Sequence, residues 1–506
     1  MPHPPTLTTG PSALTRQQLI DWGDQVTLAL AVAPEDHDGA AQPGVCLAEV
    51  PGYETDLAAW AAEAGASGVA GEAVTVTLPS VPMWDGLPRR VIFLGIGDGA
   101  PRSARRAGAV LARSTRGREH VVLATGDLMT GDALTAVVEG VQLGAYVPPY
   151  VGRREQPAPV GQVTICSAAD TDVQGAVNDG CVAAETTLVS RRLAAAPSNI
   201  KSPQWLADQA VELGREHGLR VQVRDEHWLA EHGLSGILAV GGGSVSPPRL
   251  VTVEHPGSGT DRAPVVLVGK GITFDTGGLS LKPREAMIPM KTDMAGAASV
   301  LGAVLGAARS GLPVRVVGVL PLAENAIGAS SYRPSDVITM VDGTTVEIGN
   351  TDAEGRMVLA DAMAWARAEY QPSTLVDVAT LTGAASLGLG KRHAALYATD
   401  DALRQELEAA AVRSGEQVWA MPLVEEYRSA LESNVADLSH IATDAKVGGG
   451  SITAALFLQH FAGDQPWAHL DIAGPARAAA NEHEVSQGAT GFGARLLLRW
   501  LQALDW

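Results

Sequence analysis

Short apolar runs rich in Val, Ile and Leu alternate with helical stretches along most of this chain, and this alternation limits the possible folds more than any other feature. Because the runs are apolar on both faces, they predict strands of a sheet that helices cover on both sides. Strands are expected at 26–32, 90–97, 120–125, 265–270, 314–321, 375–380 and 468–474. Helices are expected at 103–113, 295–309 and 357–370. The pattern therefore predicts an α/β fold.

The length and composition predict a folded protein of two domains that does not span a membrane. The 506 residues exceed what one hydrophobic core usually organises. The longest apolar run, 295–308, is shorter than the ~20 residues that cross a bilayer, and the N-terminus shows no signal peptide. The scattered cysteines, Cys46, Cys166 and Cys181, favour a reducing compartment, so a cytoplasmic protein is expected.

The formal net charge of -19 at pH 7 bears on the partners of this protein. Nucleic-acid phosphates and anionic membranes carry the same sign of charge, so both are disfavoured as partners. A net negative charge of this kind suits a protein that attracts divalent cations.

One segment, VGKGITFDTGGLSLKP (268–283), places Lys270, Asp275 and Lys282 where a buried strand is predicted to end. A solvated loop would carry more charge and fewer apolar residues. A second segment, MIPMKTDMAGAASV (287–300), places Asp293 just before the helix expected at 295–309, which is rich in alanine and glycine. Because burying an isolated carboxylate is expensive, each of these acids needs a cation or a proton.

A third segment, NTDAEGRMVLADAM (350–363), supplies Asp352, Glu354 and Arg356. If it is extended, the three side chains share one face, because side chains alternate along a strand. An ordinary ion pair would explain any one of the acids. Four carboxylates on glycine-rich backbone at strand ends instead favour a site for two divalent cations, whose charge they would balance.

Several other kinds of active site are disfavoured by the residues present. A phosphate-binding loop ending in Gly269-Lys270 would need glycine at 264 and a hydroxyl at 271, but Pro264 and Gly271 stand there. The chain has no HExxH motif, and its Gly-Gly-Gly-Ser segments are not the GxSxG turn of a serine hydrolase. No cysteine has a plausible histidine partner close by in sequence, so a cysteine peptidase is also disfavoured.

These segments resemble a known family, the cytosol leucyl aminopeptidases. NTDAEGR (350–356) resembles the family signature, and GKGITFDTGGLSLKP (269–283) and MKTDMAGAA (290–298) resemble its two other catalytic segments. The resemblance continues in order through SSYRPSDV (330–337), ATLTGA (379–384), SNVADLS (433–439), GGGSITAALFLQHF (448–461), WAHLDIAG (467–474) and GATGFGARLLL (488–498). It covers residues 190–506, whereas the first 160 or so residues share only the α/β character of the family's variable N-terminal domain.

The resemblance implies a fold and a domain order. It implies a smaller, macro-domain-like α/β domain at 1–165, a connecting strand and linker helix at 166–198, and a catalytic domain at 199–506. The catalytic domain is expected to have a central mixed sheet covered by helices. The resemblance also implies a homohexamer.

The resemblance implies two divalent metal ions per subunit, Mn or Zn. Their ligands are expected to be Lys270, Asp275, Asp293, Asp352 and Glu354, with Asp275 and Glu354 bridging both ions. Lys270 would bind as a neutral amine, since burial beside a dication lowers a lysine pKa.

The implied reaction releases N-terminal amino acids, leucine preferred, from peptides with a free N-terminus. A metal-bridging hydroxide would attack the carbonyl carbon, Lys282 would stabilise the oxyanion, and Arg356 would hold a bicarbonate as general base. Residues expected to contact the substrate are Met290, Asn350, Thr380, Leu381 and Gly383. Two alternatives stay open at this point: another two-metal hydrolase, and a DNA-binding or scaffolding hexamer on the same fold.

Overall fold

The computed structural model forms two compact units. The first contains Met1–Glu185 and Ala480–Gln487, and the second contains Thr186–Ala479 and Gly488–Trp506. The residues that the structure describes are 3–34, 43–45, 50–53, 56–150, 152, 157–167, 172–258, 262–444 and 446–504.

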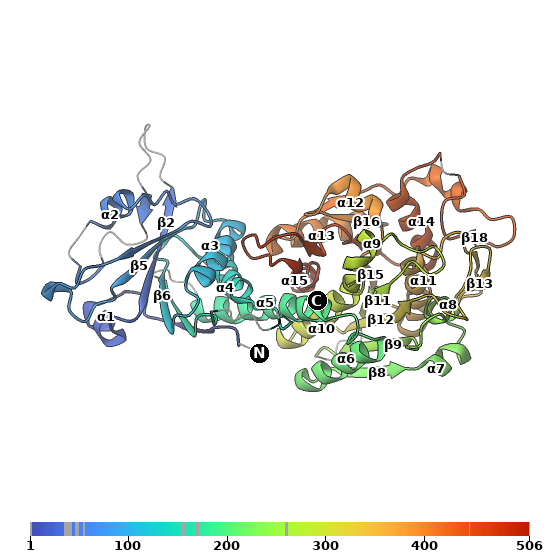
Figure 1. Ribbon diagram of the computed structural model, residues 1–506, viewed down its shortest axis with the longest axis horizontal. Helices are drawn as coiled ribbons and strands as arrows, with labels where there is room; N and C mark the ends of the chain where they lie inside the picture. Colours follow the sequence, from blue (N-terminus) through green and yellow to red (C-terminus); the bar gives the residue numbers. More distant parts are fainter. Residues whose placement is uncertain are drawn as a thin grey trace. The chain divides into compact units, whose positions relative to one another are not determined.

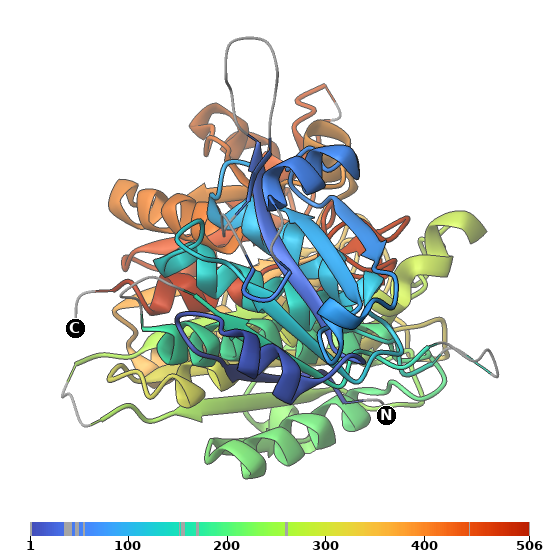
Figure 2. The same ribbon diagram turned by 90° about the vertical axis from the view of Figure 1, so that its left-hand side faces the viewer.

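The first unit (blue to teal in Figures 1 and 2) is built around a mostly parallel sheet. Its strands are β1 (Thr6–Thr9), β2 (Thr27–Pro34), β3 (Pro43–Val45), β4 (Ala73–Thr77), β5 (Arg90–Gly95), β6 (His120–Ala124) and β7 (Gln162–Cys166). Its helices are α1 (Arg16–Trp22), α2 (Leu57–Glu63), η1 (Pro82–Trp84), α3 (Pro101–Ser114), α4 (Gly131–Ala145) and the start of α5 (Val173–Ala195). The strand order is β1-β7-β6-β2-β5-β4, with β3 paired to β2.

Helices cover both faces of this first sheet. Apolar side chains of α3 and α4 pack on one face, and those of α1 and α2 pack on the other. Helices α3 and α4 approach to backbone contact, because a Cβ added at Gly140 would lie 2.0 Å from Arg105 O. Small residues therefore set the spacing of this helix pair.

The second unit contains the remaining elements. Its strands are β8 (Arg220–Arg224), β9 (Arg249–His255), β10 (Val265–Gly269), β11 (Gly271–Asp275), β12 (Val316–Asn325), β13 (Val337–Thr339), β14 (Thr345–Glu347), β15 (Thr374–Ala379), β16 (Ala394–Ala398), β17 (Val418–Ala420), β18 (Leu438–Ser439), β19 (Trp467–Asp471), β20 (Arg477–Ala478) and β21 (Gly488–Ala489). Its helices are α6 (Pro203–His217), α7 (Glu226–Glu231), α8 (Ser235–Gly241), α9 (Arg284–Met287), η2 (Ile288–Thr292), α10 (Ala295–Arg309), α11 (Glu354–Tyr370), α12 (Gly383–Leu389), α13 (Asp401–Ser414), η3 (Glu425–Leu431), α14 (Gly450–Ala462) and α15 (Ala494–Leu501).

The main sheet of the second unit has the order β17-β16-β19-β15-β10-β12-β9-β8, with β11 paired to β12. Its central strands β19, β15, β10 and β12 are parallel, whereas β9, β8 and β16 join antiparallel neighbours. Val265 and Leu267 pack against α6, α10, α13 and α15, and Val266 and Val268 face α8, α11 and α14. Figure 1 shows these two helix layers on either side of the sheet.

The predicted architecture is confirmed: a smaller α/β domain precedes a larger one with a mixed sheet covered by helices. The predicted strands and helices appear within a few residues of their expected ends. The division between the compact units falls inside α5. The domain boundaries expected at 165 and 198 stay a prediction.

The structure also bears on the expectations about membrane-spanning segments and cysteines, although not all of the residues concerned are described. No helix in the described part of the chain combines the length and the apolar character needed to cross a bilayer. Cys166 is buried and Cys181 is partly buried, and Cys46 lies outside the described residues.

The expectation for residues 352–356 was wrong in one respect. An extended segment would place Asp352, Glu354 and Arg356 on one face. Helix α11 instead begins at Glu354, so Glu354 and Arg356 are about 200° apart around the helix axis. Glu354 contacts Lys270, whereas Arg356 contacts the carbonyl of His440.

Candidate metal centre

The carboxyl ends of the central strands and the starts of two helices supply the candidate site. Lys270 follows β10, Asp275 ends β11, and Thr380 follows β15. Asp293 lies two residues before α10, and Glu354 is the first residue of α11. Ligand sites of open α/β sheets gather at this edge, and helix N-termini favour negative charge.

Three carboxylates converge at this edge of the sheet. Asp275, Asp293 and Glu354 each offer an oxygen, and these oxygens all lie within 4.8 Å of one another. The three residues are 1%, 4% and 1% exposed. We call them the acidic cluster. Three anions this close in a dry interior repel one another strongly unless cations stand between them.

Two lysines contact the acidic cluster from different sides. Lys270 Nζ lies 2.8 Å from Asp293 Oδ2 and 2.8 Å from Glu354 Oε1. Lys282 Nζ lies 2.8 Å from Asp275 Oδ2 and 2.5 Å from Asp352 Oδ1. Asp352 is therefore joined to the cluster through Lys282, and four carboxylates share two ammonium groups.

The pKa values reflect this crowding of charge. Burial, reinforced by Glu354 and Asp275 and opposed by Lys270, raises the pKa of Asp293 to about 8. Burial and the neighbouring Glu354 also raise the pKa of Asp275. For both lysines, burial acts to lower the pKa but the facing carboxylates outweigh it, so the pKa of Lys270 and that of Lys282 are raised.

The residues present fit divalent metal ions. Glu354 Oε2 is buried and has no hydrogen-bond partner among the described residues. Gly355 leaves room for Lys270 to reach the cluster, since a Cβ there would lie 2.5 Å from Lys270 Cε. Oxygen-rich donor sets with surplus negative charge are the ones that hard divalent ions occupy.

Arg356 lies beside this site but faces another neighbour. Its guanidinium is buried and donates to His440 O at 2.6 Å. Its Nε has no hydrogen-bond partner among the residues described. Burial, partly opposed by Glu354 and Asp471, lowers the pKa of Arg356 to about 10, so the group stays cationic at neutral pH.

Of the predicted substrate residues, Thr380 contacts the acidic cluster, whereas Asn350 and Leu381 bond to Asp352 and Asp471. Thr380 accepts from Lys270 Nζ at 2.9 Å through its carbonyl and donates to Asp293 Oδ1 at 2.7 Å through its hydroxyl. Asn350 Oδ1 accepts from Asp352 N at 2.9 Å. Leu381 N donates to Asp471, which fixes the loop after β15.

The remaining two predicted substrate residues lie at neighbouring elements. Met290 is half-buried in η2, and η2 ends directly before Asp293. Gly383 begins α12, and open space surrounds the position that a Cβ would take. Their roles toward a substrate stay predictions.

Sequence reasoning missed three polar residues that support the cluster. Asn325, paired with Asp275 in the β11–β12 register, donates to Asp275 Oδ1 at 2.8 Å and to Thr351 O at 3.0 Å. Tyr332 donates to Thr351 O at 2.8 Å. Asp471 accepts from Leu381 N, Thr382 and Ala473 N. The signal for Asn325 was a polar residue at the end of an apolar strand.

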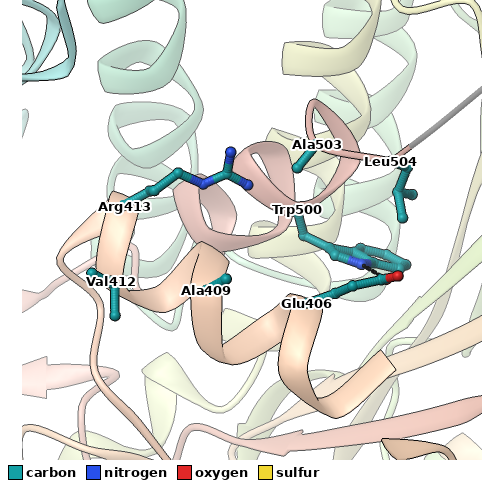
Figure 3. A pocket seen from close by; sticks show the side chains of 7 residues that line it. All are labelled: Glu406, Ala409, Val412, Arg413, Trp500, Ala503 and Leu504. Atoms are coloured by element: carbon teal, nitrogen blue, oxygen red, sulfur yellow. Dashed lines mark hydrogen bonds between the residues drawn. The ribbon is translucent and has the colours of Figure 1, made fainter. Parts of the chain in front are cut away.

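A surface pocket of about 570 Å³ lies elsewhere in the second unit, between α13 and α15. Figure 3 shows Trp500 at this pocket, with its indole donating to Glu406. The other lining residues are Ala409, Val412, Arg413, Ala503 and Leu504. None of the acidic-cluster residues lines it.

Sequence models of one family match most of the chain. The model described as "Cytosol aminopeptidase family, catalytic domain" matches residues 188–498. The model described as "Cytosol aminopeptidase family, N-terminal domain" matches residues 41–148.

Individual relatives agree with these matches. The chain is 40% identical over 499 residues to a probable cytosol aminopeptidase of Streptomyces avermitilis, covering 94% of this chain and 95% of the relative. It is 40% identical over 437 residues to a probable cytosol aminopeptidase of Chlorobaculum tepidum, covering 82% of this chain and 86% of the relative. Among solved structures, the bottromycin maturation enzyme BotP in complex with Mn is similar, with a TM-score of 0.81 and 36% identity over 95% of this chain and 99% of that chain.

Proposed function

The chain belongs to the cytosol aminopeptidase family, and from that membership we propose that it releases single amino acids, leucine preferred, from the free N-terminus of peptides. The membership itself makes the chain a metal-dependent aminopeptidase. The observation that carries the proposal is the buried acidic cluster with Lys282 at its edge.

Five residues would hold two divalent ions. Asp275 and Glu354 would contribute to both, Asp352 to one, and Asp293 with the Lys270 amine to the other. The oxygens of the acidic cluster already lie within 4.8 Å of one another, and Lys270 Nζ lies 2.8 Å from two of its carboxylates. Ion and proton would compete for the Lys270 nitrogen, because a ligating lysine must be neutral.

Bound at these residues, the ions would supply a Lewis acid and a water of lowered pKa. Lys282 supplies the complementary charge from the protein. Because the facing carboxylates raise its pKa, it stays an ammonium group and can donate to the substrate's carbonyl oxygen as negative charge develops there. Its side chain is 12% exposed, so a substrate can reach it.

Arg356 would bind a bicarbonate ion that acts as the general base. His440, the polar residue beside it, is poorly suited as a base, since burial lowers its pKa to about 4 and its ring nitrogens face Glu347 O, Asn350 O and Gly349 N. The Nε of Arg356, which lacks a partner among the described residues, suits a bicarbonate that would accept the proton and return it to the leaving amine.

The substrate's N-terminal residue would lie against Met290, Asn350, Thr380, Leu381 and Gly383. Its free amine would bind at the metal centre, which would confine the reaction to the end of the peptide. We also propose Mn or Zn as the metal, the cytoplasm as the location and a homohexamer as the assembly. The similar structure that holds Mn supports the first of these, and the family's name supports the second.

A chelation experiment tests the metal-dependent reaction. Hydrolysis of a leucine anilide should disappear when a strong chelator has removed the metal, and should return with added Mn or Zn. A control dialysed without chelator should keep its activity. Full activity at a metal content near zero, measured by elemental analysis, would contradict the proposal. Phosphoester substrates assayed in parallel test the alternative of another two-metal hydrolase.

A second candidate is the maturation of one particular peptide. It is favoured by the likeness to the bottromycin maturation enzyme, at 36% identity and a TM-score of 0.81. A panel of peptides that vary in the N-terminal residue separates the two functions. Comparable kcat/KM for many residues supports general exopeptidase action, whereas activity confined to one sequence supports maturation.

A further inference from the structure

Lys201 is a cation buried in the second unit, with a relative exposure of 1%. Its Nζ donates to Leu193 O at 3.2 Å, Ala194 O at 3.0 Å and Lys291 O at 2.5 Å. An ammonium group has three N–H donors, so these three carbonyls can take all of them. Met294 Sδ lies 3.5 Å away as a fourth neighbour.

The three carbonyls belong to two different elements. Leu193 and Ala194 lie in the last turn of α5, where carbonyls lack partners within the helix and the helix dipole is negative. Lys291 lies in η2, and the chain runs from there through Asp293 into α10. Lys201 therefore ties the end of one helix to the segment that carries a carboxylate of the acidic cluster.

This arrangement is costly for stability. Buried lysines are usually paired with a carboxylate, but Lys201 is held by carbonyls. Burial, with Lys291 and Arg477 nearby, lowers its pKa to about 7. An apolar side chain would fill the same place without the free-energy cost of burying an amino group. We therefore look for the role of Lys201 in η2, the segment to which it donates hydrogen bonds.

Two further contacts, from less buried side chains, hold the same segment. Lys291 Nζ donates to Ala195 O at 2.9 Å, which ties η2 to the end of α5 a second time. Arg477 Nη1 donates to Thr292 Oγ1 at 2.6 Å. Both side chains are less buried than Lys201, so Lys201 is the interior tie of the three.

We propose that Lys201 is a positioning residue for the metal position that Asp293 serves, because its hydrogen bonds fix η2 and thereby the Asp293 carboxylate. The inference rests on the proposed function. The ion assigned to Asp275, Asp352 and Glu354 relies on β11 and α11 instead, so removal of Lys201 should affect one ion much more than the other.

The test counts Mn²⁺ bound to the intact chain. Free Mn²⁺ is followed by electron paramagnetic resonance during titration of metal-depleted protein, and the spectrum of a coupled Mn pair is recorded at saturation. Wild type is expected to bind two ions. Lys201→Met, which keeps the length and removes the donors, is expected to bind one ion about 10- to 100-fold more weakly and to lose the coupled spectrum at intermediate metal.

Arg191→Met is the matched control. Arg191 lies in the same helix α5, is also 1% exposed and donates to Thr490 O at 3.0 Å. A variant that merely loosens the fold at a buried cation should lower the melting temperature and still bind both ions. If Arg191→Met and Lys201→Met lose metal alike, general destabilisation explains the effect and the positioning role is wrong.

A second variant decides the case in which Lys201→Met does not fold. Lys291→Met removes the more exposed tie between the same elements, and it should weaken the same ion by a smaller factor. Unchanged affinity for both ions in the folded variants overturns the inference while the proposed function stands. Failure of wild type to bind two ions overturns the proposed function itself, so the two failures are distinguishable.

Discussion

One buried group of charges in the first unit and one in the second differ in how cations and carboxylates meet. In the first unit, Arg105 of α3 faces Glu139 of α4 at 2.6 Å, and the two side chains are 1% and 0% exposed. These opposite charges meet between helices in close contact. In the second unit the acidic cluster and Asp352 share the two ammonium groups of Lys270 and Lys282.

The difference between the ion pair and the acidic cluster helps to distinguish charges that stabilise the fold from charges that bind a ligand. The Arg105–Glu139 ion pair joins two packed helices, and this structural role accounts for it. In the acidic cluster, burial together with the neighbouring Glu354 and Asp275 raises the pKa of Asp293, and such strain persists where a ligand relieves it. Variants that remove a single charge should therefore have opposite consequences in the two units.

The largest effect is expected for Glu354→Gln. The change removes a ligand assigned to both ions, so the loss of kcat should exceed the roughly 100-fold that loss of an outer partner of a metal ligand costs. The same change reduces repulsion in the acidic cluster, so metal-depleted protein should keep its melting temperature. Leucine-anilide kinetics and calorimetry of the chelated protein measure the two effects. A metal-depleted variant that melts far below wild type would break the comparison.

Arg105→Met should have the opposite profile. It leaves Glu139 buried without this cation, which should lower the free energy of unfolding by about 3–5 kcal/mol, measured by urea denaturation. Mn²⁺ affinity should not change. The double variant Arg105→Met with Glu139→Leu should recover most of the stability, because replacing both partners by apolar groups removes the unpaired charge. A double variant as unstable as the single one would show that the pair is not the cause.

The acidic side of this contrast was accessible from the sequence. Apolar runs predict the strands, and Asp275, Asp293 and Glu354 stand out because they interrupt apolar surroundings at strand ends and helix starts. The start of α6 follows a local pattern as well, because Ser202 with proline after it is typical of a helix start, and its hydroxyl accepts from Trp205 N at 3.1 Å.

The parts that failed depend on contacts between distant segments. Asn325 and Lys201 act through residues 50 and 90 positions away, and a local pattern carries no record of such pairs. The start of α11 at Glu354 was missed because charges at every second position are typical of a strand but also arise by chance in other structures. Helix packing decides that start, and the packing is known only once the sheet has formed.

The third prediction separates Lys282 from Lys270. Lys282→Met should bind both ions and lose about 10²- to 10³-fold in kcat, because a donor to a developing oxyanion is lost. Lys270→Met should instead lose affinity for the ion assigned to Asp293. Elemental analysis after gel filtration gives the metal content, and equal content in the two variants would contradict the division of roles.

The smallest effect concerns acid and His440, which is fully buried in the second unit. Burial, with Arg356 nearby, lowers the pKa of His440 from 6.5 to about 4. As pH falls, the histidine of the unfolded chain takes up a proton before the buried one does, and this favours unfolding. The free energy of unfolding is therefore unaffected by His440 above pH 6.5 and decreases as pH falls toward 4. The loss should reach roughly 3 kcal/mol at its full extent.

Urea denaturation of metal-depleted protein at several pH values between 7.5 and 4.5 measures this loss without interference from metal release. His440→Gln should flatten the pH dependence relative to wild type, because the titrating group is gone. His227→Gln, at an exposed histidine of the same unit, should leave the wild-type curve unchanged. If His440→Gln follows wild type through the whole range, other groups of the second unit carry its acid sensitivity.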